Sequence, residues 1–234
     1  MKQVNYLLLG IRLTATAFSL SSCSDDDDNI DYDEIMPTAL VTIKPNADNS
    51  AFTMQLNDSV VLYPSNMKSS PFGNKEVRAF ANFEREDDMP NHNGRLVEVN
   101  WMDSILTKGM AHNYSEKNDS AYGKDPVEVV NSWETVVEDG YLTMRFRTRW
   151  GMGSKHLVSL VSAGDENDPY KVVFHHNAFG DLNGPWGDGV VAFRLDRLPD
   201  TNGKTVDLTL EWNSFSGKKT AKFKYRTRQE ARIE

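Results

Sequence analysis

The chain has 234 residues, of which 39% are hydrophobic and 10% aromatic, and its formal net charge is −8. The aromatic content excludes a chain that is disordered throughout, and the lack of an apolar run of about 18 residues excludes a polytopic membrane protein. The excess of acidic residues argues against nucleic acid as a partner, because binding phosphates needs a basic surface. One cysteine, Cys23, can form neither an intrachain disulfide nor a cysteine-rich zinc site.

The N-terminal segment, residues 1–22, has the three parts of a secretory signal peptide. Lys2 makes its start basic, an apolar stretch ends at Leu20, and two small serines precede Cys23. The run LSSC at 20–23 resembles the lipobox of bacterial lipoproteins. This resemblance implies cleavage before Cys23 and acylation of that cysteine, which attaches the chain to a membrane. The alternative is an N-terminal helix with an incidental thiol.

Residues 23–36 form an acidic segment in which seven acidic residues lie between Asp25 and Glu34. Like charges repel one another, so we expect an extended, flexible tether. Its first acidic run is either a solvated spacer or an export signal, because a short acidic run after the lipidated cysteine resembles the surface-export signal of Bacteroidetes lipoproteins. We favour the signal, which predicts a lipid-anchored outer-membrane protein that faces the cell surface. The residues of this signal are Asp25, Asp26, Asp27 and Asp28.

The rest of the chain is predicted to be all-β and to form two domains. Short stretches of alternating apolar and polar residues, broken by turn residues, follow one another from residue 37 onward. Five of these stretches fall within residues 37–112 and predict a small OB-like β-barrel. They cover residues 39–43, 52–56, 60–63, 77–83 and 96–101.

The second domain is predicted to begin after a polar stretch, residues 113–126, which we interpret as a linker. Residues 127–230 then show short strand patterns at regular spacing, as is typical of an antiparallel β-sandwich. The clearest pattern covers residues 141–150, where Leu142, Met144 and Phe146 alternate with more polar residues.

Several of these stretches are similar to the NigD-like lipoproteins of Bacteroides and its relatives. In the first half they are VTIK (41–44), FTMQL (52–56) and VNWMDSILTK (99–108). In the second half they are DPV (125–127), YLTMRFR (141–147) and FHHNAFGD (174–181). The resemblance implies an N-terminal OB-type barrel followed by a C-terminal β-sandwich. The family is named after a bacteriocin gene cluster, which implies an immunity or accessory role.

The most unusual loop, residues 177–189, combines four glycines and two aromatic residues with Asn and Asp side chains. Aromatic rings beside such polar groups are typical of sugar and peptide sites. The candidate ligand-binding residues are Asn177, Phe179, Asp181, Asn183, Trp186 and Asp188. The alternative is a turn-rich hairpin whose two aromatic rings pack at the end of the sandwich.

The histidines give little sign of a metal site. His175 and His176 are adjacent in a predicted strand, so their side chains point to opposite faces. We therefore expect one of them to cap the core and the other to be exposed, and we predict no bound metal. The alternative is a site that combines one of them with Asp181 across a turn.

No motif typical of catalysis or of a cofactor site is found, so we predict no enzyme, no catalytic residue and no cofactor. A basic stripe of Arg145, Arg147 and Arg149 is expected to be a solvent face with acidic partners, or else to bind an acidic glycan. The leading hypothesis is a cell-surface protein that binds an unknown protein, with bacteriocin immunity or surface assembly as its role. The second is a carbohydrate-binding accessory lipoprotein. A hydrolase, the third, lacks an identifiable pair of carboxylates.

Overall fold

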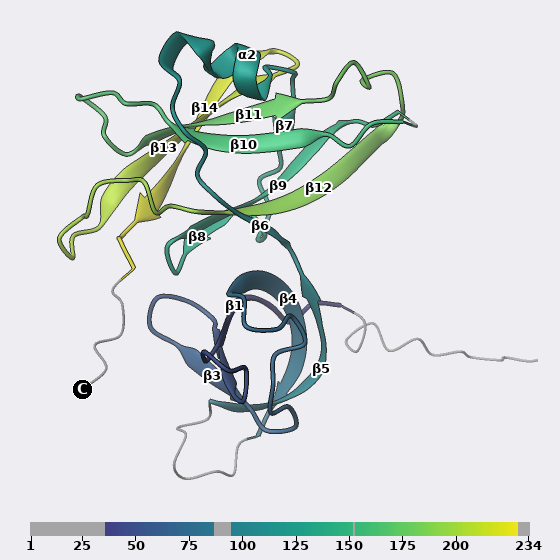
Figure 1. Cartoon of the computed structure of the whole chain (residues 1–234), viewed down its shortest axis with the longest axis vertical. Coiled ribbons are helices and arrows are strands. Elements are labelled where there is room, and N and C mark those ends of the chain that lie inside the picture. Colours follow the sequence, from purple (N-terminus) through teal and green to yellow (C-terminus); the bar gives the residue numbers. More distant parts are fainter. Residues whose placement is uncertain (1–35, 87–94, 152, 229–234) are drawn as a thin grey trace, which may run out of the picture. The chain divides into compact units, whose positions relative to one another are not determined.

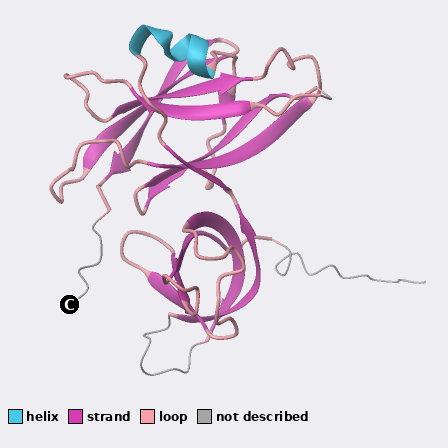
Figure 2. Cartoon of the chain, viewed as in Figure 1, coloured by secondary structure: helices cyan, strands magenta, loops and turns pink. Residues whose placement is uncertain are grey.

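The computed structural model describes residues 36–86, 95–151 and 153–228. The predicted signal peptide, Cys23 and the four aspartates at 25–28 lie outside these residues. Within the described ranges, no helix is both long and apolar enough to cross a membrane. Strands make up nearly all of the regular structure (Figure 2), which confirms the predicted all-β fold class with a barrel followed by sheets.

The first domain is a closed barrel of five strands (Figure 1), as the sequence predicts. Its strand order is β1-β2-β3-β5-β4, and pairing between β4 and β1 closes the ring. The neighbours β3 and β5 are parallel, whereas the other pairs of the barrel are antiparallel. The five strands are β1 (Ala39–Pro45), β2 (Phe52–Gln55), β3 (Val61–Pro64), β4 (Val77–Arg85) and β5 (Leu96–Ser104).

The barrel core follows from the alternation along these strands. Val41 and Ile43 of β1 point inward and are fully buried, as is Met54 of β2. Small residues fill the same interior on β4, where Ala79 and Ala81 leave room for the larger side chains opposite them. Fully burying a large aliphatic side chain contributes about 1.5–3 kcal/mol, so this interior stabilises the barrel.

The second domain consists of two sheets that pack face to face as a β-sandwich. One sheet has the order β6-β12-β9-β7, with β8 also paired to β9, and the other has the order β10-β11-β13-β14. The pairs β6–β12 and β11–β13 are parallel. The strands are β6 (Leu106–Gly109), β7 (Glu128–Val129), β8 (Val136–Glu138), β9 (Tyr141–Arg149), β10 (Leu157–Ser162), β11 (Lys171–Asn177), β12 (Trp186–Arg194), β13 (Val206–Ser214) and β14 (Gly217–Tyr225).

The sandwich core lies between the inward faces of the two sheets. Leu142, Met144 and Phe146 of β9 belong to it, and Phe174 of β11 contacts Phe146 with ring centroids 5.6 Å apart. The arginines of β9 alternate with these residues, so they lie on the outer face of the sheet. Strand β6 adds to this same sheet, although its residues fall within the predicted barrel range of 37–112.

The predicted linker, residues 113–126, is ordered. It contains the short helices η1 (Ser115–Lys117) and α2 (Asn118–Tyr122), and α2 contacts β10 and β11 (Figure 1). The linker therefore covers the outer face of one sandwich sheet instead of only joining two domains.

Because the linker covers this sheet, the prediction that one of the two adjacent histidines is exposed is wrong. His175 and His176 are both buried, at opposite faces of β11. His176 points to the core side, whereas His175 lies beneath the linker, where its Nδ1 is 2.9 Å from the carbonyl oxygen of Gly123. The prediction was wrong because strand alternation assigns a side chain to a face but does not show what covers that face.

Candidate functional site

The predicted ligand loop connects β11 to β12 and displays one aromatic ring at a strained turn. The side-chain oxygen of Asn177 accepts a hydrogen bond from the backbone N–H of Phe179, at 2.9 Å. Phe179 has a φ of 52° and is followed by Gly180 with a φ of 83°. A bulky residue rarely adopts this left-handed conformation, and the Phe179 side chain is nevertheless 60% exposed. Backbone strain combined with an exposed aromatic ring is a mark of functional loops.

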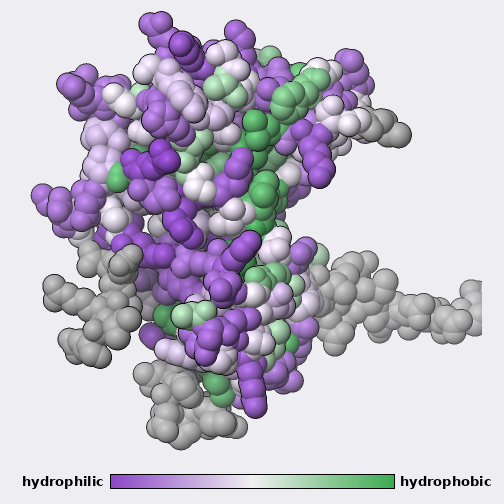
Figure 3. All heavy atoms as spheres, in the orientation of Figure 1, coloured by the Kyte–Doolittle hydropathy of each residue, from purple (hydrophilic) through white to green (hydrophobic). Residues whose placement is uncertain are grey.

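A second exposed aromatic group lies where β12 begins. Trp186 is 49% exposed and contacts Phe215, which is 42% exposed, with ring centroids 5.0 Å apart. The guanidinium of Arg149, which faces Trp186 across the β9–β12 pair, lies 4.8 Å from the centroid of the indole. Exposed hydrophobic side chains also interrupt the hydrophilic surface on the side drawn in Figure 3.

The arginine stripe of β9 continues this surface along the outer face of the sheet. Asp188 faces Arg147 in the register of the two strands and binds it through both carboxylate oxygens, at 2.5 and 3.0 Å. Arg145 donates to the same carboxylate at 2.8 Å and approaches Glu134 at 3.5 Å. The hydrogen bond from Arg147, assisted by Arg145, lowers the pKa of Asp188 to about 2. Arg145 and Arg147 thus have the predicted acidic partners, whereas Arg149 donates to the carbonyl oxygen of Gly184 at 3.2 Å.

We call this region the aromatic–arginine surface. It comprises Arg145, Arg147, Arg149, Trp186, Asp188 and Phe215. Two contacts surround the indole: Arg149 lies over the ring of Trp186, and Phe215 meets that ring at an interplanar angle of 71°. These two groups occupy part of the indole surface on which a sugar would stack. The surface therefore suits a broad macromolecular contact better than a sugar groove.

Asp181 of the predicted site points inward. Its carboxylate accepts the backbone N–H of Ser154 at 3.3 Å and lies 3.8 Å from Nε2 of His156. A Cβ atom on Gly151 would come within 1.5 Å of the same carboxylate, so Asp181 is packed tightly against that glycine. Asn183 is exposed in the loop. Of the six predicted residues, Trp186 and Asp188 share one surface, and Asp181 has a structural role.

Behind Asp181 lies a buried histidine pair that the sequence did not indicate. His156 stacks on Trp150 with ring centroids 4.0 Å apart, and its Nδ1 is 2.9 Å from Nε2 of His176. Burial, reinforced by the neighbouring imidazole of His156, lowers the pKa of His176 to about 4. Among the described residues, no group of three or more His, Cys, Asp or Glu side chains is placed to hold a metal ion.

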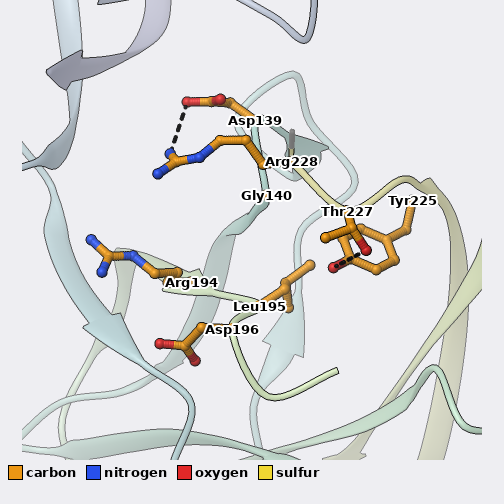
Figure 4. A pocket seen from close by; sticks show the side chains of 8 residues that line it. All are labelled: Asp139, Gly140, Arg194, Leu195, Asp196, Tyr225, Thr227 and Arg228. Atoms are coloured by element: carbon orange, nitrogen blue, oxygen red, sulfur yellow. Dashed lines mark hydrogen bonds and ion pairs between the residues drawn. The ribbon is translucent and has the colours of Figure 1, made fainter. Parts of the chain in front are cut away.

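A charged pocket of about 210 Å³ lies at another part of the sandwich (Figure 4). In Figure 4, Arg228 and Asp139 point toward each other, while Arg194 and Asp196 extend along another part of the lining. Arg228 also binds both oxygens of Glu76, at 2.8 and 3.1 Å. The pocket is lined by Asp139, Gly140, Arg194, Leu195, Asp196, Tyr225, Thr227 and Arg228.

The charges beside this pocket neutralise one another. The hydroxyl of Tyr141 donates to Glu76 at 2.5 Å and accepts from Arg194 at 3.0 and 3.2 Å. Burial and the bond to Glu76 raise the pKa of Tyr141 to about 12. The fully buried Arg78 of β4 likewise reaches Glu138 at 3.5 Å. Glu76 and Arg78 lie in the barrel part of the sequence, whereas these partners lie in the sandwich part. The network therefore joins distant parts of the sequence and stabilises the fold.

Two protein-family models together match nearly all of the described residues. The NigD-like N-terminal OB domain matches residues 40–105, and the NigD-like C-terminal beta sandwich domain matches residues 110–225. The chain belongs to the NigD-like family. No match was found among curated proteins.

Solved structures similar to this chain come from species of Bacteroides and Parabacteroides. A structure from Parabacteroides distasonis, described as toxin-related, is 37% identical with a TM-score of 0.69, and the match covers 81% of this chain and 92% of that one. A NigD-like immunity protein from Bacteroides caccae is 19% identical with a TM-score of 0.56, and the match covers 80% of this chain and 96% of that one. A protein of unknown function from Bacteroides vulgatus is 19% identical with a TM-score of 0.61, over 80% and 89% of the two chains. The last two likenesses show the fold alone.

Proposed function

We propose that this NigD-like protein is a lipid-anchored envelope protein that binds another protein through its aromatic–arginine surface. The observation that carries the proposal is the exposed contact of Trp186 with Phe215 and Arg149. Tryptophan and arginine dominate the energetics of protein interfaces, and exposed aromatic contacts of this kind mark interaction surfaces. Phe179, in the same connection between β11 and β12, is also exposed at a strained turn.

The proposed anchor is a lipid on Cys23, followed by the acidic tether. Acylation by several chains holds a protein at a membrane far more firmly than a single chain does. We place the protein at the outer membrane, with the signal at residues 25–28 directing it to the cell surface. Protease added to intact cells then cleaves the wild-type protein but not a variant with residues 25–28 changed to Ala. A wild-type protein that is protected until the cells are lysed contradicts surface display.

The proposed partner is a protein at the cell envelope, with immunity toward a bacteriocin or assembly of a surface complex as the role. Support comes from the family to which the chain belongs and from the description of its Parabacteroides relative as toxin-related. We propose binding without catalysis and without a nucleic acid partner. The carbohydrate alternative at Phe179 and Trp186 is less favoured, because Arg149 and Phe215 already occupy part of the indole surface.

Site-specific photo-crosslinking in intact cells tests this proposal. A photoreactive residue replaces Phe215 within the surface or, as a control, Trp133, which is also exposed (53%, against 42% for Phe215) but lies outside it. We expect a defined protein adduct from position 215 that disappears in the Arg149→Ala background. The same adduct from position 133, or no adduct from position 215 in correctly folded protein, refutes the proposed surface.

A further inference from the structure

Strand β14 forms a long free edge of the sandwich. It runs for nine residues at the end of the sheet order β10-β11-β13-β14, and it pairs with β13 in an unbroken register. The opposite edge of this sheet, β10, is covered, because the backbone N–H of Ala111 donates to the carbonyl oxygen of Leu160 at 2.8 Å. In the other sheet the edge strands β6, β7 and β8 have only four, two and three residues. Among the described strands of the sandwich, β14 is therefore the free edge best suited to pair with a further chain.

The hairpin between β13 and β14 fixes which backbone groups face this edge. Ser214 and Gly217 close a two-residue turn, so they form a hydrogen-bonded pair. Hydrogen-bonded and non-bonded pairs alternate along an antiparallel ladder, so every second residue of β14 turns its N–H and C=O away from β13. Within the described ranges these groups make no backbone hydrogen bond to another strand or loop. The residues that carry them are Lys218, Thr220, Lys222 and Lys224.

A pocket of about 290 Å³ lies beside residues 221–223 of this edge. Its apolar members belong to the sandwich core or pack against it. Ala221 and Phe223 alternate with exposed lysines, so they lie on the core side of β14. Directly opposite residues on paired strands point to the same face, so a side chain placed opposite Ala221 or Phe223 enters the pocket. The pocket is lined by Val129, Asn131, Thr135, Trp212, Ala221, Lys222 and Phe223.

The outer face of the same edge is basic, and one of its charges is unmatched. Lys218 and Lys224 each have an acidic partner on β13, at 3.0 and 2.6 Å. Lys222 is exposed, faces Thr209 in the register and makes no ion pair with any described residue. An acidic side chain opposite Lys222 on an added strand supplies the partner that β13 lacks, because opposite charges on paired strands attract.

The lysines also argue against a second copy of this chain as the added strand. Two β14 edges that pair with each other bring their lysines together on one face, and like charges in that position are destabilising. Lysine on an edge strand is a common protection against such self-association. The complementary chain is therefore a different one, with apolar residues facing the pocket and acidic residues facing Lys222.

We infer that β14 binds an extended acidic segment of another protein as an additional strand. The outward backbone groups of Thr220 and Lys222 hydrogen-bond to the main chain of that segment, which gives affinity without regard to sequence. The pocket beside Phe223 and the charge of Lys222 select a segment in which apolar and acidic residues alternate. The site shares no residue with the aromatic–arginine surface, so the inference stands independently of the proposed function.

Binding of labelled synthetic peptides to the detergent-solubilised full-length lipoprotein tests this inference. The probe is a short peptide that alternates Glu and Leu. One control peptide alternates Lys and Leu, and another has the composition of the probe with its leucines placed together. We expect fluorescence anisotropy to show that the probe binds at least about tenfold more tightly than either control, because only the probe matches both the pocket and the lysines.

Two variants of the protein separate the charge from the backbone contribution. Lys222→Glu exchanges an attraction for a repulsion and weakens binding of the probe about tenfold. Its matched control, Lys204→Glu, makes the same charge change at an exposed lysine outside β14 and leaves the affinity unchanged. Thr220→Pro removes an outward N–H without breaking the pairing with β13, and we expect it to weaken binding about tenfold as well.

Amide hydrogen exchange, resolved by residue, reports strand pairing directly. In the free protein we expect the outward N–H groups of β14 to exchange faster than those bonded to β13, and the probe peptide to slow them. Protection elsewhere on the protein overturns the inference, as does equal affinity for the three peptides or an unchanged affinity of Lys222→Glu. So does a dimer of the free protein that Thr220→Pro abolishes, because the edge then pairs with a second copy.

Thermal unfolding of each variant shows whether its fold is intact. Lys222 is exposed and has no ion pair to lose, so we expect Lys222→Glu to keep the melting temperature of the wild type. This variant decides the question even where the proline at position 220 destabilises the strand.

Discussion

The buried pair of His156 and His176 makes the stability of the fold depend on pH. His176 has a pKa of about 4 in the folded protein and an ordinary value of 6.5 when unfolded. Because the folded state binds the proton less tightly, the stabilisation is complete above pH 6.5 and is lost as the pH falls toward 4. The difference of about 2.5 pKa units corresponds to about 3.4 kcal/mol at most, and about 2 kcal/mol of it is lost between pH 7.5 and 5.0.

Urea unfolding followed by circular dichroism at pH 7.5 and 5.0 measures this loss. In the His176→Gln variant the amide keeps a hydrogen-bonding group beside His156 but no longer titrates. We expect its unfolding free energy to fall by about 2 kcal/mol less than that of the wild type between the two pH values. The control His112→Gln, which removes an exposed histidine, retains the wild-type dependence. An equal pH dependence in His176→Gln and the wild type refutes the reasoning.

Further perturbations test packing, charge burial and anchoring. Arg78→Ala leaves Glu138 without its buried partner, and we expect urea unfolding to show a loss of about 3–5 kcal/mol, against less than about 1 for the exposed ion pair removed in Lys224→Gln. Gly184→Ala places a Cβ atom 1.5 Å from a backbone oxygen, so we expect calorimetry to show a loss of at least about 2 kcal/mol, whereas Gly153→Ala meets open space and changes little. Cys23→Ser abolishes acylation, so mass spectrometry of the membrane fraction finds no lipidated N-terminus.

Contrary outcomes would separate the causes. Equal losses in the Arg78 and Lys224 variants would show that burial of the guanidinium adds nothing to its ion pair. A stable Gly184→Ala protein would show that the two loops at this end of the sandwich can move apart. A Cys23→Ser protein that still carries a lipid would show that another residue is acylated.

Strand alternation let the sequence determine which side chains form each core. Met54 of the barrel and Phe146 of the sandwich lie on the faces that their alternating neighbours predict, and both are buried. The same alternation places the arginines of β9 on the outer face, where their acidic partners were expected. The family and the all-β fold class were predictable for the same reason, because they rest on short local patterns.

Only the tertiary structure decided which strands are neighbours and what covers each face. Periodicity assigns residues to a face but carries no information on pairing partners, so the parallel contact of β6 with β12 was not foreseen. The burial of His175 needed the cover of the linker, and the charged network needed Glu76 to meet Arg228 across 152 positions. Sites built from such distant residues have no local signature, because chain folding alone brings their side chains together.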